Sequence, residues 1–251
     1  MVSRILGKAL ILHQKLLTLE LRQKMDLFAP LDLYCERTDA GFFSEPLNLI
    51  SNLAFIIAGV FLLRRLALKQ SSQLATSARI LAWQVIIVGV GSALFHSFAM
   101  VWSKVCDVVP IGLFILSYLW FFSRNIAMLS RNSSAMGIVI FAIMSIAVAS
   151  LADPVKANGG QFYFGTWITL LALAFYLAGS RNRLASPKML FASVLFSISV
   201  TMRSIDLTLC DYWPYGTHIF WHLLNACVLY LVVDAYIAND HPSKDAQTRE
   251  G

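Results

Sequence analysis

The segment from Gly216 to Asn225 reads Gly-Thr-His-Ile-Phe-Trp-His-Leu-Leu-Asn and begins the last long apolar run of the chain. His218 and His222 are four residues apart, so a helix would place their side chains one turn apart on the same face. Two imidazoles inside a membrane-length segment are costly unless something binds them. A metal ion is the simplest partner, because two helical histidines and a third ligand from elsewhere form a common zinc site. The alternative is a pair of buried histidines that are hydrogen-bonded between helices.

The composition of the whole chain predicts an all-α membrane protein. The chain has 251 residues, of which 58% are hydrophobic and 14% are charged, whereas soluble domains average about 25% charged residues. The net charge of +6 comes from basic residues at the ends of apolar runs. They are not grouped with aromatic residues, which argues against a nucleic-acid partner. Four cysteines without a C-x-x-C pair are too few for a disulfide scaffold.

Seven apolar segments have the ~20 residues that a membrane-spanning helix needs. Their expected bounds are 47–63, 80–101, 105–122, 136–152, 162–178, 189–209 and 217–237. We therefore expect an N-terminal peripheral segment with an acidic loop (1–46), a seven-helix transmembrane domain (47–237) and a cytoplasmic tail (238–251). Within the first part, residues 3–29 mix apolar and basic side chains, which favours a helix that lies on the membrane or on the bundle.

Basic residues predict the orientation. Loops on the side of the C-terminus carry most of them: Arg64, Arg65, Lys69, Arg79, Arg124, Arg131, Arg181, Arg183, Lys188, Lys244 and Arg249. Loops on the other side carry only Lys104 and Lys156. Because positive loops stay in the cytoplasm, the C-terminus is expected to be cytoplasmic and the N-terminus outside.

With this topology, polar side chains from four segments gather at the outer end of the bundle. They are Ser92, His96, Asp107, Arg203, Asp206, His218 and His222. A random distribution would place such residues in both leaflets. Their shared depth therefore predicts a functional site.

Three imidazoles, those of His96, His218 and His222, leave a fourth zinc position for water, which is typical of catalytic zinc. Zinc lowers the pKa of bound water to about 7. Asp107 is then a candidate base that accepts a proton and returns it to a leaving group. Its structural alternative is the N-cap of the third helix.

Ser92 lies one turn from His96 and would donate to a developing oxyanion, or bond to a carbonyl within its own helix. Arg203 and Asp206 are three residues apart, and we expect them to form an internal ion pair. Three residues of the first span are expected to form interhelical hydrogen bonds: Asn48, Ser51 and Asn52.

The stretch before the first span is acidic, with Asp32, Glu36, Asp39 and Glu45. Its oxygens could hold a hard cation such as Ca²⁺, or the stretch could be a solvated loop. Cys35 and Cys210 both fall on the expected outer side, where oxidation is allowed, and a disulfide between them is expected.

Three groups of residues match a known family: Tyr34-Cys-Glu-Arg37 with Glu45-Pro-Leu-Asn48 and Ser51-Asn52, Ser92-Ala-Leu-Phe-His96 with Asp107, and Gly216-Thr-His-Ile-Phe-Trp-His222. The sequence resembles the alkaline ceramidases and their bacterial relatives, in the CREST superfamily of seven-helix membrane hydrolases. That superfamily also contains the progestin and adipoQ receptors.

The resemblance implies zinc on the three histidines, assistance from Asp107 and Ser92, and a calcium site that includes Glu36 and Glu45. The short loops are most similar to bacterial members, which implies an inner-membrane location.

The expected function is zinc-dependent hydrolysis of an N-acyl membrane lipid, such as ceramide, to a fatty acid and a sphingoid-type amine. The alternatives are a receptor-like signalling protein with structural zinc, and a metal or proton transporter. Asp107 favours the enzyme, because a structural site does not need such a carboxylate. A transporter should carry ionisable residues along the whole path, but the inner halves of the spans contain almost none beyond Asp234.

Overall fold

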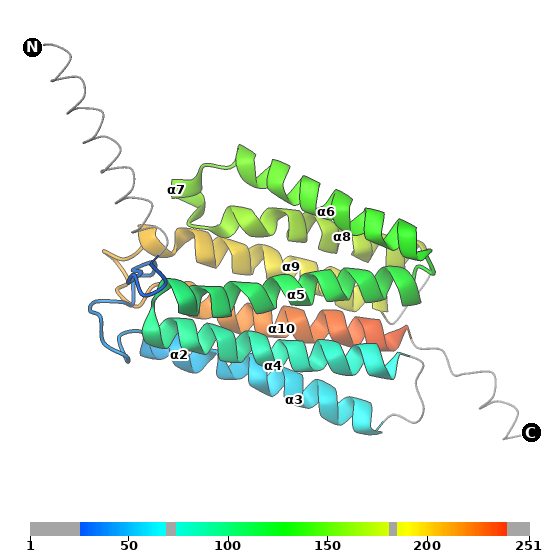
Figure 1. Cartoon of the computed structure of the whole chain (residues 1–251), viewed down its shortest axis with the longest axis horizontal. Coiled ribbons are helices and arrows are strands. Elements are labelled where there is room, and N and C mark those ends of the chain that lie inside the picture. The colour runs from blue at the N-terminus through cyan, green and yellow to red at the C-terminus, as the bar shows by residue number, and fades with distance from the viewer. Residues whose placement is uncertain (1–25, 69–73, 181–184, 240–251) are drawn as a thin grey trace, which may run out of the picture.

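The computed structural model describes residues 26–68, 74–180 and 185–239 (Figure 1). Within these ranges seven helical spans are long and apolar enough to cross a membrane, so the predicted number and the all-α class are confirmed. They are α2 (Pro46–Ser51) with α3 (Leu53–Leu68), α4 (Ala75–Phe98), α5 (Val101–Asn125), α6 (Arg131–Leu151), α8 (Phe164–Gly179) with the preceding η1 (Gly160–Tyr163), α9 (Ala185–Ile205) with η2 (Asp206–Thr208), and α10 (His218–Ala238). A short helix, α7 (Pro154–Ala157), follows α6. The peripheral helix expected over residues 3–29 falls almost entirely outside the described residues.

Helix α10, which carries two of the histidines, is the centre of the bundle. Each span packs on the next one in the chain, and α10 closes the ring by packing on α3 as well as on α9 and α4 (Figure 1). About half of its apolar window, 56%, is buried, compared with 6% for α6. Helix α6 therefore lies at the edge of the bundle, whereas α10 is the most buried of the seven spans.

One end of the bundle is held by charged and hydrogen-bonded side chains. Asp234 of α10 pairs with Arg65 of α3 at 2.6 Å and with Lys188 of α9 at 2.5 Å. Nearby, the hydroxyl of Tyr236 bonds to Ser77 at 2.7 Å and accepts from Asn125 at 2.6 Å. A buried carboxylate is stable only with such partners. Asp234 therefore joins three helices, α3, α9 and α10.

At the opposite end, the segment from residue 26 to residue 45 lies across the ends of the helices (Figure 1). Its backbone pairs with the link between α4 and α5, where the N–H of Leu31 donates to the carbonyl of Ala99 at 2.7 Å. A disulfide joins Cys35 to Cys210, with 5.2 Å between their Cα atoms, as predicted. The segment is thus fastened to both α4 and the end of α9.

The ion pair expected between Arg203 and Asp206 is not formed. Helix α9 ends at Ile205, and Asp206 begins the tighter turn η2, so the helical three-residue spacing no longer brings the two side chains together. The carboxylate of Asp206 instead accepts backbone N–H groups from Cys35, Thr217 and His218, at 2.6 to 3.1 Å.

The guanidinium of Arg203 donates to the Tyr34 hydroxyl at 2.8 Å. It also lies 5.2 to 5.7 Å from the ring centroids of Tyr34, Tyr163 and Trp221, which is within the range of cation–π attraction. Arg203 therefore stabilises a cluster of aromatic rings rather than a carboxylate.

Candidate metal centre

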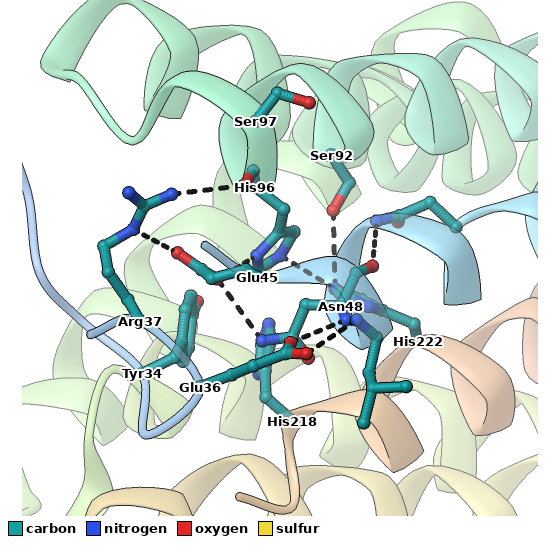
Figure 2. Close-up of polar contacts among 12 residues, drawn as sticks. Tyr34, Glu36, Arg37, Glu45, Asn48, Ser92, His96, Ser97, His218 and His222 are labelled. Carbon is teal, nitrogen blue, oxygen red and sulfur yellow. Dashed lines mark hydrogen bonds and ion pairs between the residues drawn. The ribbon is translucent and has the colours of Figure 1, made fainter. Parts of the chain in front are cut away.

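The structure brings His96, His218 and His222 together (Figure 2), at the end of the bundle that the segment 26–45 covers. His96 comes from the last turn of α4, and the other two lie in the first two turns of α10. Each is at most 1% exposed. One nitrogen from each ring lies within 4.8 Å of the others, an arrangement that could hold a metal ion.

Hydrogen bonds fix which nitrogen of His96 faces the centre. Its Nδ1 is 2.5 Å from Oε2 of Glu45. Burial alone would raise the pKa of Glu45, but its interactions with His96 and Arg37 lower that pKa, so the side chain is a carboxylate that can only accept. The proton of His96 therefore lies on Nδ1, and Nε2 presents a lone pair to the centre.

His222 is oriented in the same way by Ser51. The Ser51 hydroxyl donates to the carbonyl of Asn48 at 2.8 Å, and it lies 2.7 Å from Nδ1 of His222. Because the hydroxyl proton is already used, Ser51 accepts the Nδ1 proton of His222. The Nε2 lone pair of His222 then faces the centre as well. The predicted interhelical hydrogen bond of Ser51 is confirmed, and it acts directly on a candidate ligand.

These tautomers favour a cation between the rings. The Nε2 atoms of His96 and His222 are only 3.1 Å apart, and two lone pairs at that distance repel each other. The Nδ1 of His218 is buried and has no hydrogen-bond partner within the described part of the chain. Buried polar atoms normally have a partner, and three imidazole nitrogens directed at one point form a donor set that zinc accepts.

Tyr34 covers the third histidine. Its ring stacks on that of His218 with 3.6 Å between centroids and an angle of 18° between the planes. Burial raises the pKa of the Tyr34 hydroxyl above its ordinary value, so the group stays neutral and accepts from Arg203. The disulfide at the next residue, Cys35, fastens the backbone beside this ring to Cys210.

Ser92 lies beside the histidines, as predicted. Its hydroxyl is 3.4 Å from Nε2 of His222 and also interacts with the carboxylate of Asp107. The serine is 3% exposed. Its hydroxyl therefore points into the centre and is available to a bound group.

The structure places Asp107 beside Ser92 and rejects the N-cap alternative. Helix α5 begins at Val101, and its N-cap is Met100, whose N–H bonds to the Ser103 hydroxyl at 3.0 Å. Asp107 therefore lies in the second turn of α5, beyond the N-cap. With no cap to form, its side chain is free to act at the centre.

The four acidic residues before the first span do not form one cluster. Glu36 accepts the N–H groups of Leu47 at 2.6 Å and Asn48 at 2.8 Å, one on each oxygen, and so satisfies the first turn of α2. Asp32 and Asp39 are exposed. In the described residues, the three histidines are the one group of three or more side chains whose spacing suits a metal ion. A calcium site built from Asp32, Glu36, Asp39 and Glu45 stays a prediction that this arrangement does not favour.

Glu36 and Asp39 have opposite pKa shifts that reflect these local roles. Burial raises the pKa of Glu36, against the effect of the two N–H groups. The hydrogen bonds from Ser44 and from the Gly41 N–H lower the pKa of Asp39. Asp39 thus stabilises its own exposed turn rather than a shared cation.

An apolar cavity of about 90 Å³ adjoins the centre. It shares two rings with it, because Phe55 lies beside His222, Trp221 stacks on His218, and both line the cavity. The cavity extends along α10 as far as Val232. Val232 lies ten residues beyond His222, which corresponds to about 15 Å at a helical rise of about 1.5 Å per residue. The lining is apolar apart from Thr166, Thr169, Asn225 and the tyrosine hydroxyls.

Sequence reasoning assigned no role at the centre to Tyr34 or Arg37. Both lie in the Tyr34–Arg37 motif, which carried the family resemblance without a stated function. Their contacts with the histidines depend on the folding of the segment over the bundle, and hydrophobic periodicity does not report such contacts. The motif itself was the signal that could have pointed to them.

The fold and site define a seven-helix membrane protein with a buried three-histidine centre beside an apolar cavity. The family model for ceramidases matches residues 34–250. The chain therefore belongs to the ceramidase family, a family of hydrolases that act on a lipid amide bond. No curated protein matches the chain.

Proposed function

We propose that this protein is a zinc-dependent membrane amidase that hydrolyses an N-acyl lipid such as ceramide to a fatty acid and a sphingoid-type amine. The observation that carries the proposal is the position of three imidazole lone pairs beside an apolar cavity. Membership of the ceramidase family supports the same reaction.

Each polar residue of the centre would have a separate role in this reaction. Zinc held by His96, His218 and His222 would polarise an amide carbonyl and make water reactive at neutral pH. Asp107 would accept the proton that water gives up and return it to the amine that leaves. The Ser92 hydroxyl would donate a hydrogen bond to the carbonyl oxygen as negative charge develops on it.

The cavity supports a lipid as the substrate. An acyl chain lying along α10 would place its apolar length against the rings and aliphatic side chains, and its amide at the histidines. Burial of apolar surface contributes about 25 cal/mol per Å², so the acyl chain would supply much of the binding free energy. We place the amide at the outer leaflet, because basic residues are concentrated at the other end of the bundle.

The test is metal analysis of the purified protein, followed by mass spectrometry of N-acyl lipids incubated with it. We expect about one zinc per chain, since three histidines and an open position form one site, and release of fatty acid from at least one N-acyl lipid. His222→Ala should lose the metal and the activity.

Two outcomes would contradict the proposal. A folded His222→Ala variant with a full complement of zinc would remove the proposed site. Zinc-loaded wild-type protein that hydrolyses no N-acyl lipid would favour the receptor-like alternative instead.

A further inference from the structure

Arg37 is buried at the edge of the histidine centre and uses all three nitrogens of its guanidinium. Its Nε lies 2.5 Å from Oε1 of Glu45, Nη1 donates to the carbonyl of Asp39 at 3.1 Å, and Nη2 donates to the carbonyl of His96 at 3.2 Å. The side chain is 5% exposed. Arg37 thus binds the backbone carbonyl of His96 directly, and it is linked to the His96 ring by Glu45, which binds both side chains (Figure 2).

Glu45 lies between Arg37 and His96 and binds both side chains. One carboxylate oxygen binds the guanidinium, and the other binds Nδ1 of His96 at 2.5 Å and the side-chain amide of Asn48 at 3.3 Å. The side chain is 1% exposed. A buried carboxylate costs several kcal/mol unless it is paired and hydrogen-bonded, and here Arg37 supplies the charge partner.

These contacts leave no suitable place for the calcium ion that the family resemblance implies. Ca²⁺ takes about six to eight oxygen ligands. Both oxygens of Glu45 and both of Glu36 already have protein partners, and Asp32 and Asp39 are exposed. A divalent cation at Glu45 would also be repelled by the guanidinium 2.5 Å from the same carboxylate.

We propose that Arg37 is a built-in cation that replaces calcium in this protein and positions His96 through Glu45. An arginine side chain is always protonated, so this cation is present at every calcium concentration. Glu45, held by Arg37, keeps the His96 proton on Nδ1 and directs Nε2 towards the metal. Carboxylates that orient a histidine ligand in this way raise its basicity and strengthen metal binding. The proposal rests on the three-histidine metal site but not on the identity of the lipid.

The first experiment measures thermal unfolding of the purified, zinc-loaded wild-type protein with calcium added and with a calcium-selective chelator. A ligand that binds the folded state raises the melting temperature by mass action. We expect the same melting temperature in both conditions. A rise on addition of calcium would overturn the proposal, whatever the protein's activity on lipids.

The second experiment measures zinc affinity by competition with a coloured chelator. Arg37→Gln should bind zinc about 10- to 100-fold more weakly, the range found when the group behind a ligand is changed. Arg37→Lys should fall between Arg37→Gln and the wild type, because an ammonium keeps the charge but not the planar fork. Arg79→Gln is the matched control, since Arg79 is exposed on α4. Wild-type zinc affinity in a folded Arg37→Gln protein would overturn the positioning role.

A double variant covers the case in which Arg37→Gln does not fold. Arg37→Leu combined with Glu45→Gln removes both charges and leaves no unpaired ion in the site. We expect it to fold and to bind zinc more weakly than the wild type, because a neutral amide is a poorer acceptor for His96 than a carboxylate. Full zinc affinity in this double variant would contradict the proposal.

Discussion

At the scale of single residues, the centre consists of ligands whose protons are placed by their neighbours. Glu45 and Ser51 each hold the Nδ1 proton of one histidine, so the lone pairs of His96 and His222 face each other. A repulsive arrangement persists only where something else stabilises it. The hydrogen bonds around the histidines thus indicate a bound cation more strongly than their spacing does.

Asp107 gives the sharpest test at this scale. Asp107→Asn keeps the shape of the side chain but cannot accept a proton from water. Because Asp107 is not the N-cap of α5, we expect zinc content and melting temperature close to wild type. Turnover of the lipid amide should fall by about 10²- to 10⁴-fold, the contribution assigned to general acid–base catalysis. The measurement is steady-state hydrolysis of the best N-acyl lipid.

Asp211→Asn, at an exposed position on the same end of the molecule, is the control for this variant and should behave as wild type. Near-wild-type hydrolysis by Asp107→Asn would remove Asp107 from the mechanism.

At the scale of helices, Asp107 lies beside Ser92 because α4 and α5 come unusually close. A Cβ atom on Gly91 would overlap the backbone carbonyl of Cys106, so only glycine allows this approach. The link between the two helices is short, since α4 ends at Phe98 and α5 begins at Val101. The close approach places the second turn of α5 beside Ser92.

We therefore expect Gly91→Ala to separate α4 from α5 and to move Asp107 away from Ser92. Inserting a methyl group into a packed contact costs about 1–3 kcal/mol, so both the free energy of unfolding and the rate of hydrolysis should decrease. Gly112→Ala in α5 is the control, because a Cβ there meets no atom within 4 Å. Unfolding in detergent and lipid hydrolysis are the measurements. An unchanged free energy of unfolding and an unchanged rate of hydrolysis in Gly91→Ala would contradict a role for the close contact between α4 and α5.

The sequence predicted the helices better than their ends. Hydropathy predicted the seven spans because an apolar run of this length is typical of a membrane-spanning helix. It placed Asp107 at the start of a helix, because the apolar run begins there, whereas the helix begins at Val101 with Met100 as its N-cap. It also paired Arg203 with Asp206 by helical spacing, which fails where α9 tightens into η2. Contacts made by the segment before the first span, including those of Tyr34 and Arg37, depend on tertiary folding that periodicity does not contain.

At the scale of the whole molecule, the two ends of the bundle differ in kind. The histidines, the disulfide and Asp107 lie at one end. Arg65, Lys188 and Asp234 lie at the other. The distribution of basic residues predicts that the second end faces the cytoplasm.

A reporter that is active only in the cytoplasm, fused after Gly251, should therefore be active, and one that requires an oxidising compartment should be inactive there. The same fusion after Asp211, in the turn between α9 and α10, should give the reverse pattern. The opposite result for both fusions would invert the orientation and place the histidine centre at the cytoplasmic leaflet.

The cavity ends part-way through the bundle, and this has a consequence for the cell. Beyond its floor at Tyr118 and Val232, whose side chain and carbonyl are hydrogen-bonded at 3.1 Å, the charged and hydroxyl-bearing side chains of the other end bind one another. In the part of the chain that the structure describes, the polar groups of the two ends are thus separated by the apolar cavity and its floor. A lipid could be cut inside this protein while the membrane around it keeps its proton and ion gradients.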